Sequence, residues 1–231
     1  MRAIFSVYDK NGVVDFGRSM AKAGLELVST GGTYRELHEA GLPVSTVSEI
    51  TGFPEIMDGR VKTLHPLVHG GILARRDVSG DLDQLAVHGI KAVDLVTVNL
   101  YPFADTVAKP EVDLNEALEN IDIGGPTMVR AAAKNFPYVI VIVDTSDYTW
   151  IAERICKGGP AAITMAERRS LAAKAFNHVA IYDKAIARYL ATSQTQSGNE
   201  SQTLTETMTI SLQRTAKLRY GENPHQGAAL Y

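Results

Sequence analysis

The chain has 231 residues, 45% hydrophobic and 21% charged, so it is long and apolar enough to bury a full core. Acidic residues outnumber basic ones by 26 to 23. Sequence-independent nucleic-acid binding requires a surplus of Lys and Arg, so this composition argues against that function. The single cysteine, Cys156, excludes an intramolecular disulfide, and no Cys/His cluster predicts a metal site.

Membrane insertion and export are also not indicated by the sequence. No apolar run reaches the roughly 18 residues of a membrane-spanning helix, and the apolar run after Met1 is too short for a signal peptide. We therefore expect a cytoplasmic protein that contacts neither a membrane nor nucleic acid.

Short apolar runs rich in β-branched residues alternate with segments of helical spacing. Helical spacing occurs within 13–23, 34–40 and 127–134. This alternation predicts an α/β fold with a mainly parallel sheet. The predicted strands are Ala3 to Val7, Leu25 to Ser29, Val93 to Leu100 and Tyr138 to Val143.

The sequence from Ser146 to about Ala191 is predicted to be mainly helical. Capping patterns, Asp113 with Glu116 and Thr164 with Glu167, predict that helices begin near both positions. The expected inward-facing residues are Ile151, Ile155, Ile163, Leu171, Ala175, Ile181, Ile186 and Leu190.

A change in composition divides the chain. Residues 193–209 are mostly Ser, Thr, Gln, Gly, Asn and Glu, which cannot bury enough apolar surface to order themselves, and we interpret them as a linker. Met208 to Leu212 resembles a strand, and 218–226 is a dense polar motif. We expect one domain over 1–192 and the truncated start of another over 210–231.

The segment Ser29, Thr30, Gly31, Gly32 and Thr33 lies between a predicted strand and a predicted helix. Glycines let backbone N–H groups approach an anion, and the dipole of the following helix favours negative charge there. The two threonines would add hydroxyl groups. The segment therefore predicts a phosphate site, although a glycine turn followed by a helix cap at Thr33 explains the same residues.

Polar residues follow two of the predicted strands. Tyr8, Asp9 and Lys10 follow the first strand, and Asn99 and Tyr101 end the third. Open parallel sheets bind their ligands at the carboxyl edge, which favours a functional reading. The alternatives are a helix cap at Asp9, a solvated charge at Lys10 and simple packing of Tyr101 beside a proline.

The stretch from Phe53 to Arg76 has little hydrophobic periodicity, and long irregular segments in compact domains are usually functional. Arg60, Lys62 and Thr63 are candidates to hold a phosphate or to polarise a carbonyl. We interpret the two histidines of this stretch, His65 and His69, as packed loop residues.

A second glycine turn runs from Asp122 through Gly124 and Gly125 into a predicted helix that bears Arg130 and Lys134. An acid at the turn and an amine further along would flank a reacting group from two sides. Alternatively, the two cations form a solvated helix face, because their spacing places them on the same side.

Taken in order, these motifs resemble one family, the inosine monophosphate cyclohydrolase half of the bifunctional purine-biosynthesis enzymes. The resemblance covers nearly all of residues 1–192, and 218–226 resembles the start of that family's transformylase half. The motifs are Ser6 to Lys10, Ser29 to Thr33, Gly59 to Pro66, His69 to Arg75, Asn99 to Phe103, Ile121 to Gly125 and Arg130 to Asn135.

The resemblance implies a methylglyoxal-synthase-like three-layer sandwich with a mainly parallel sheet and a C-terminal helical segment. It also implies the dehydrative ring closure of 5-formamidoimidazole-4-carboxamide ribotide to inosine monophosphate, without metal or organic cofactor. The family acts as a homodimer, at least at full length. We expect transformylase activity to be absent from this chain.

The resemblance further implies roles for individual residues. Lys134 would transfer a proton, Asp122 would orient the carboxamide, and Lys62 with Tyr101 would assist at the formyl oxygen, where negative charge develops. The nucleotide would be bound by Tyr8, Asp9, Lys10, Ser29, Thr30, Gly31, Gly32, Thr33, Arg60, Val61, Thr63, Asn99, Leu100, Ile123, Gly124 and Gly125.

Two other functions remain open at this point. The same fold serves as a regulatory module for phosphorylated effectors, and fold does not determine function. Methylglyoxal synthase is the second alternative and would need a carboxylate base beside the phosphate loop, for which Asp9 is a candidate. The cyclohydrolase reading requires Lys62, Tyr101, Asp122 and Lys134 to converge on one ligand-sized space.

Overall fold

The structure is a computed structural model that describes residues 1–109, 111–193, 212 and 214–231. By internal contacts the chain divides into two units, residues 1–193 and 194–231. No helix within the described residues is long and apolar enough to cross a membrane.

A five-stranded sheet forms the centre of the first unit, in the order β3-β2-β1-β4-β5. Every pair of neighbouring strands is parallel. The four predicted strands are confirmed, whereas β3 was missed because its three residues are only half-buried and carry little apolar signal. The strands are β1 (Arg2–Val7), β2 (Glu26–Ser29), β3 (Val44–Thr46), β4 (Leu95–Asn99) and β5 (Ile140–Ile142).

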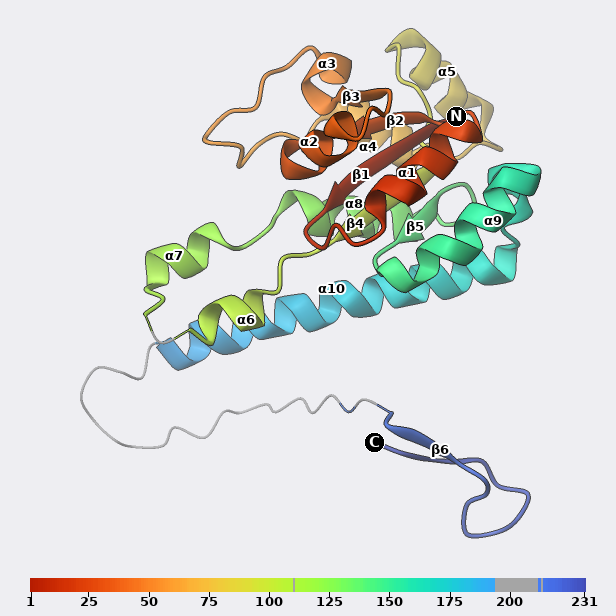
Figure 1. The fold of residues 1–231 in the computed structure, drawn as a ribbon. Coiled ribbons are helices and arrows are strands. Elements are labelled where there is room, and N and C mark those ends of the chain that lie inside the picture. Colours follow the sequence, from red (N-terminus) through yellow and green to blue (C-terminus); the bar gives the residue numbers. More distant parts are fainter. Residues whose placement is uncertain (110, 194–211, 213) are drawn as a thin grey trace. The chain divides into compact units, whose positions relative to one another are not determined.

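Helices cover both faces of this sheet, which confirms the three-layer α/β fold (Figure 1). On one face lie α1 (Val13–Lys22), α2 (Gly31–Glu39) and α9 (Tyr148–Gly158). On the other lie α4 (Pro66–Leu73), α8 (Gly124–Lys134) and α10 (Met165–Ser193), which is the predicted C-terminal helical segment.

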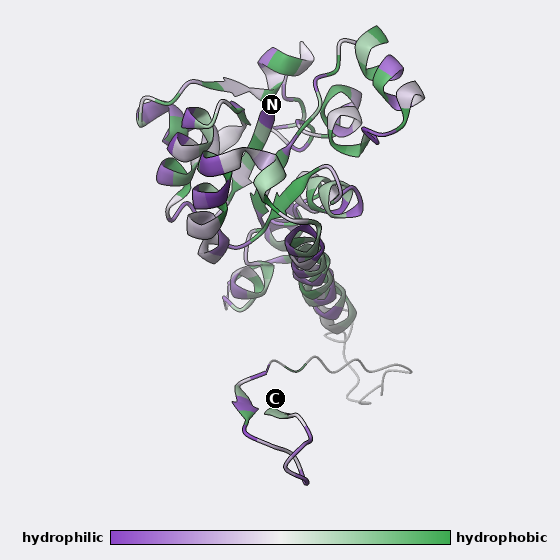
Figure 2. Ribbon diagram, turned by 90° about the vertical axis from the view of Figure 1, so that its right-hand side faces the viewer, coloured by the Kyte–Doolittle hydropathy of each residue, from purple (hydrophilic) through white to green (hydrophobic). Residues whose placement is uncertain are grey.

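The core lies between these layers. The sheet strands are predominantly hydrophobic (Figure 2), and Phe5, Leu95 and Ile140 are fully buried within them. Of the inward positions expected on α10, Leu171 and Ala175 are buried. Ile181 and Leu190 are exposed, which corrects that expectation: α10 extends past the sheet, and only one side of it meets the core.

Shorter helices complete the unit, and the predicted caps are found at the start of one of them, α7 (Leu114–Glu119), and at the start of α10. The Asp113 carboxylate accepts from the Glu116 N–H at 2.8 Å, and the Thr164 hydroxyl accepts from the Glu167 N–H at 3.3 Å at the start of α10. The elements are α3 (Val47–Thr51), α5 (Ser79–Val87), α6 (Phe103–Val107), α7 (Leu114–Glu119), η1 (Thr145–Asp147) and η2 (Pro160–Ala162).

Two expectations about local structure were wrong. The stretch from Phe53 to Arg76 is not irregular throughout, because it contains α4, which begins at a proline in the first helical turn. The second helix begins at Gly31 rather than at Tyr34, so both glycines belong to its first turn.

In the second unit, β6 (Ala216–Leu218) and β7 (Ala228–Leu230) form an antiparallel pair. The predicted linker, 193–209, lies outside the described residues except for residue 193, which ends α10. The strand expected at 208–212 also lies outside them except for Leu212, which belongs to no helix or strand.

The end of α8 is tied to the end of α4 by a buried side chain. The Asn135 amide donates to the Ile72 carbonyl at 2.7 Å and to the Ala74 carbonyl at 3.0 Å. Because these helices share one layer, the contact helps to set the position of α8, whose other end reaches the carboxyl edge of the sheet.

We predict that Asn135→Ala lowers the free energy of unfolding by about 1–3 kcal/mol, because two buried carbonyls lose their donor. Urea unfolding followed by circular dichroism measures this. Asn177, exposed on α10, provides the control. Asn177→Ala should change the free energy by less than about 0.5 kcal/mol, and an equal loss in both variants would contradict the prediction.

Candidate functional site

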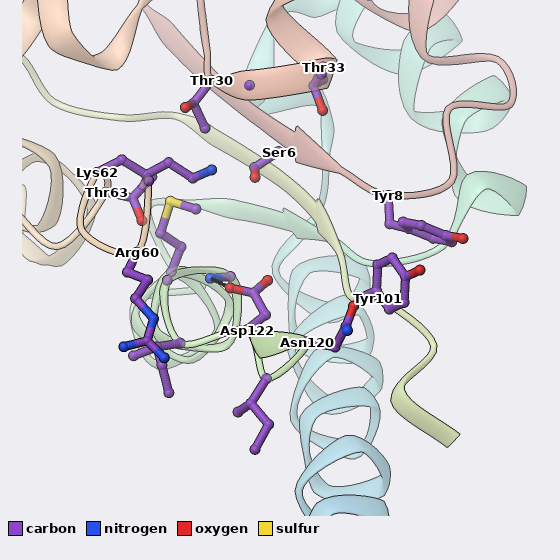
Figure 3. Close-up of a pocket in the computed structure, with 18 of the residues that line it drawn as sticks. Ser6, Tyr8, Thr30, Thr33, Arg60, Lys62, Thr63, Tyr101, Asn120 and Asp122 are labelled. Carbon is purple, nitrogen blue, oxygen red and sulfur yellow. Dashed lines mark hydrogen bonds between the residues drawn. The ribbon is translucent and has the colours of Figure 1, made fainter. Parts of the chain in front are cut away.

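A cavity of about 870 Å³ opens at the carboxyl edge of the sheet (Figure 3). It lies at β1, where the strand order reverses: β2 and β3 extend the sheet on one side of β1, and β4 and β5 on the other. Open parallel sheets bind ligands at this position. It is lined by the ends of β1 and β4, the first turns of α2 and α8, and residues 57–64 and 118–123.

The first turn of α2 forms one end of the cavity. Thr30 is the N-cap residue, and within the described structure its side chain makes no capping hydrogen bond. The N–H groups of a first helical turn have no partner inside the helix, so they are available to an anion. Gly31 has a φ of +55°, which favours glycine.

Two ammonium groups flank this turn. The Lys62 Nζ lies 3.7 Å from the place that a Cβ would take on Gly31, and the Lys10 Nζ lies 3.6 Å from the same place on Gly32. Two cations beside a helix N-terminus form an electrostatic site for a phosphate-sized anion.

The hydroxyl groups of this segment have partners within the protein. Thr33 accepts from the Val7 N–H at 2.9 Å and donates to the Val7 carbonyl at 3.0 Å, and Ser29 donates to the Phe5 carbonyl at 2.8 Å. The Thr30 hydroxyl donates to the Glu55 carboxylate at 2.7 Å. The expected hydroxyl contribution of Thr33 is therefore corrected: its hydroxyl joins α2 to β1.

The loops after β1 and β4 are joined by one side chain. The Asn99 amide oxygen accepts from the backbone N–H groups of Tyr8, at 2.7 Å, and Asp9, at 2.9 Å. Its amide nitrogen donates to the Asp9 carbonyl at 3.1 Å. Asn99 therefore lines the cavity and also fixes the backbone that carries Tyr8.

Two phenols stand at the opposite end of the cavity from α2 (Figure 3). The rings of Tyr8 and Tyr101 meet edge to face with centroids 4.2 Å apart. A hydrogen bond with Tyr101 raises the pKa of Tyr8 above its ordinary value. This end offers aromatic surface and hydroxyl groups to a ligand.

Residues 56–64 form one wall. The backbones of Ile56 and Val61 pair as an antiparallel bridge, and Met57 and Asp58 between them adopt positive φ angles of 55° and 54°. Arg60 makes a two-point ion pair with Glu119, at 2.7 and 3.2 Å, which joins this wall to α7.

The two histidines after this wall have structural roles. The His65 Nδ1 accepts from the Leu67 N–H at 3.2 Å and so caps α4. Burial lowers the pKa of His69, which keeps that ring neutral. No group of three or more His, Cys, Asp or Glu residues within the described ranges could hold a metal ion.

The first turn of α8 forms the remaining wall. The Asp122 carboxylate accepts from the Gly125 N–H at 2.9 Å, and the Asp122 N–H donates to the Tyr182 hydroxyl of α10 at 2.7 Å. Gly124 packs against Thr63, since a Cβ there would lie 2.5 Å from the threonine hydroxyl oxygen. Thr63 is almost completely buried.

The structure brings most of the predicted site residues together. Of the four side chains expected to converge, Lys62, Tyr101 and Asp122 line the cavity. The other predicted residues that line it are Tyr8, Lys10, Thr30, Gly31, Gly32, Thr33, Arg60, Val61, Thr63, Asn99, Ile123, Gly124 and Gly125.

Lys134 does not join them, which corrects the expected convergence. It is exposed at the last residue of α8, about 15 Å along the helix axis from Gly124 and about 9 Å from Met128, both of which line the cavity. Asp9, Ser29 and Leu100 also lie outside the lining. The Asp9 carboxylate accepts from the Asn11 N–H at 3.0 Å, and Leu100 is buried in the core.

Several lining residues were not singled out from the sequence. Met57 and Asp58 precede a predicted motif, 118–120 end α7, and Met128 lies one turn inside α8. The irregular character of 53–65 was the available signal for the first pair. The lining residues of α7 and α8 had no such signal in the sequence, because their hydrophobic spacing is that of an ordinary helix.

Comparisons with known proteins show the family of the chain. The chain matches the MGS-like domain family over residues 12–127 and the AICARFT/IMPCHase bienzyme family over 132–231. Bifunctional purine biosynthesis protein PurH of Chloroflexus aurantiacus is 51% identical over all 231 residues, and that of Listeria monocytogenes is 52% identical over 230. The chain spans 43% and 44% of these relatives, respectively.

A solved structure is similar as well. The crystal structure of ForH matches with a TM-score of 0.73 and 38% sequence identity, over 81% of this chain and 96% of that one.

We predict that Gly124→Ala destabilises the fold by about 1–3 kcal/mol, because the new Cβ collides with Thr63. Thr63→Ala removes the colliding hydroxyl. The double variant Gly124→Ala with Thr63→Ala should therefore be more stable than the sum of the single changes by at least about 0.5 kcal/mol. Urea unfolding of all four proteins gives this coupling, and additive effects would refute the contact.

Proposed function

We propose that this protein is an inosine monophosphate cyclohydrolase. The chain belongs to the MGS-like domain family, and all of its residues match the N-terminal part of PurH. The proposed reaction is the dehydrative ring closure of 5-formamidoimidazole-4-carboxamide ribotide. Neither a metal nor an organic cofactor takes part in the proposed reaction.

The observation that carries the proposal is a cavity with two chemically different ends. The α2 turn with Lys10 and Lys62 suits the ribose phosphate. The end with Tyr8, Tyr101 and Asp122 suits an aromatic base that bears polar groups. A nucleotide that spans the cavity would place its phosphate at the first end and its base at the second.

The proposed chemistry requires a poor nucleophile, the carboxamide nitrogen, to attack the formyl carbon. The reacting groups belong to one molecule, so the protein mainly has to select the reactive rotamer and stabilise charge. In this proposal the Tyr101 hydroxyl donates to the formyl oxygen as negative charge develops there. The Asp122 carboxylate, which lines the cavity and also accepts from the Gly125 N–H, accepts from the carboxamide N–H.

Lys62 lies beside Gly31, at the proposed phosphate end of the cavity. Its flexible stem lets the ammonium group serve either the phosphate or the formyl oxygen, the role implied by the resemblance. The two roles differ in kinetics, because a phosphate contact acts mainly on KM, whereas a contact made only in the transition state acts on kcat.

The domain proposal rests on the change in composition near residue 193 and on the division of the chain into units 1–193 and 194–231. We assign residues 1–192 to the cyclohydrolase domain, 193–209 to a linker and 210–231 to the start of a transformylase domain. We propose that residues 1–231 by themselves have no transformylase activity. We further propose a cytoplasmic homodimer in the context of the full-length enzyme.

We predict that the purified protein converts 5-formamidoimidazole-4-carboxamide ribotide to inosine monophosphate, followed by ultraviolet absorbance. Lys62→Ala should lower kcat/KM at least about tenfold, because a charge-assisted contact is worth roughly 1.5–3 kcal/mol. Lys157→Ala, which removes an exposed charge on α9, is the matched control. Tight ligand binding without turnover would favour the regulatory module.

A second variant tests the place of Lys134. Lys134→Ala should retain kcat within about threefold, because surface substitutions far from a site have small effects. A large loss of kcat would contradict the assignment of the site to one chain, since Lys134 would then have to reach the cavity of another copy.

Turnover of dihydroxyacetone phosphate to methylglyoxal provides the remaining test. We expect none, because Asp9, the candidate base for that reaction, lies outside the cavity lining.

A further inference from the structure

Three polar side chains of α10 follow one another at intervals of four residues: Lys174, His178 and Tyr182. Residues at this spacing lie on the same side of a helix. Each of them contacts a different loop at the carboxyl edge of the sheet, and two of these loops carry side chains of the cavity. Figure 3 shows α10 beside the segments that bear Asn120 and Tyr101.

Tyr182 contacts the loop before α8. Its hydroxyl accepts from the Asp122 N–H at 2.7 Å and donates to the Asn120 carbonyl at 3.4 Å. The ring is held edge to face against Phe103, with centroids 6.3 Å apart, and only 7% of the residue is exposed. A rigid, buried phenol therefore determines where the backbone of Asp122 lies.

His178 contacts the loop after β4. Its Nε2 accepts from the Leu100 N–H at 3.4 Å, and the residue on either side of Leu100 lines the cavity. Burial lowers the pKa of His178 and keeps the ring neutral, as an acceptor nitrogen must be. The contact places the backbone that leads directly into Tyr101.

Lys174 holds the third loop, which follows β5. Its ammonium group pairs with Asp144 at 2.6 Å and with Asp147 at 2.7 Å. This loop does not line the cavity, so the Lys174 contacts fix α10 against the sheet without touching the site.

We propose that Tyr182 and His178 are positioning residues, which set the separation of Asp122 and Tyr101 by holding the backbone N–H groups beside these side chains. The inference rests on the proposed function for its catalytic consequence, because Asp122 and Tyr101 are the groups proposed to act on the carboxamide and the formyl oxygen. Neither Tyr182 nor His178 lines the cavity.

The test uses Tyr182→Phe in the full 231-residue protein, with Tyr148→Phe as the matched control. Tyr148 is 6% exposed, packs on Phe16, and its hydroxyl has no hydrogen-bond partner within the described residues. Both changes remove one buried hydroxyl from one buried phenol. Only the first removes an acceptor from the Asp122 N–H.

We expect Tyr182→Phe to lower kcat about tenfold while KM changes less than about threefold, since one hydrogen bond is lost and no cavity group is removed. Tyr148→Phe should keep kcat within about twofold. Equal kcat values in the two variants would overturn the proposal, as would a loss in KM alone.

Amide hydrogen exchange tests the positioning without relying on turnover. Tyr182→Phe should speed exchange at the Asp122 amide at least about tenfold and leave the Leu100 amide unchanged. His178→Ala should do the reverse, and His178→Gln, whose side-chain oxygen can accept in place of Nε2, should restore protection of Leu100. If both amides respond to either change, or to neither, the positioning role is refuted.

The two readouts separate the failure of this inference from that of the proposed function. A wild-type protein that does not close the ring refutes the cyclohydrolase assignment, while the exchange pattern still decides the positioning role. Ring closure by the wild type together with unchanged exchange and kcat in Tyr182→Phe refutes the inference alone.

Discussion

The site depends on one topological constraint, the reversal of strand order at β1. The chain builds the sheet outward from β1 in both directions, to β2 and β3 on one side and to β4 and β5 on the other. The loops that leave β1 and β4 therefore separate toward opposite faces, and a space opens between their carboxyl ends. The cavity occupies this space, and its polar groups are those that the departing loops carry.

Loops that leave a sheet in this way have backbone polar groups without ladder partners, and these groups must be satisfied elsewhere. Asn99 satisfies the N–H groups of two residues after β1. His178 and Tyr182 do the same for the loops after β4 and before α8. The contacts that satisfy these backbone groups are thus also the contacts that hold the cavity side chains in place.

Residues close in sequence to a motif were predictable, because a strand end and a glycine turn carry their own local signals. The strands with continuous apolar runs, the caps at Asp113 and Thr164, and the α2 turn could all be predicted in this way. β3 could not, since three half-buried residues leave no pattern. The supporting residues of α10 were also out of reach, because a tyrosine 60 positions from Asp122 reads as ordinary helix packing.

Lys134 shows the limit of carrying a role over by resemblance. Resemblance fixes which residue type occupies a position, but a helix of eleven residues moves its last side chain away from the site that its first turn lines. The Asp122 side chain caps the start of that helix, whereas Lys134 extends from its end. Two motif residues, one just before a helix and one at its end, can therefore differ in whether they line the cavity.

The cavity's polarity follows from the same geometry. The α2 turn contributes backbone N–H groups and is flanked by Lys10 and Lys62, so this end attracts negative charge. At the other end the phenols of Tyr8 and Tyr101 meet edge to face, so that end offers uncharged hydroxyl donors. Under the proposed function, a substrate with a phosphate at one end and a neutral polar ring at the other would bind in a single orientation, as an intramolecular ring closure requires.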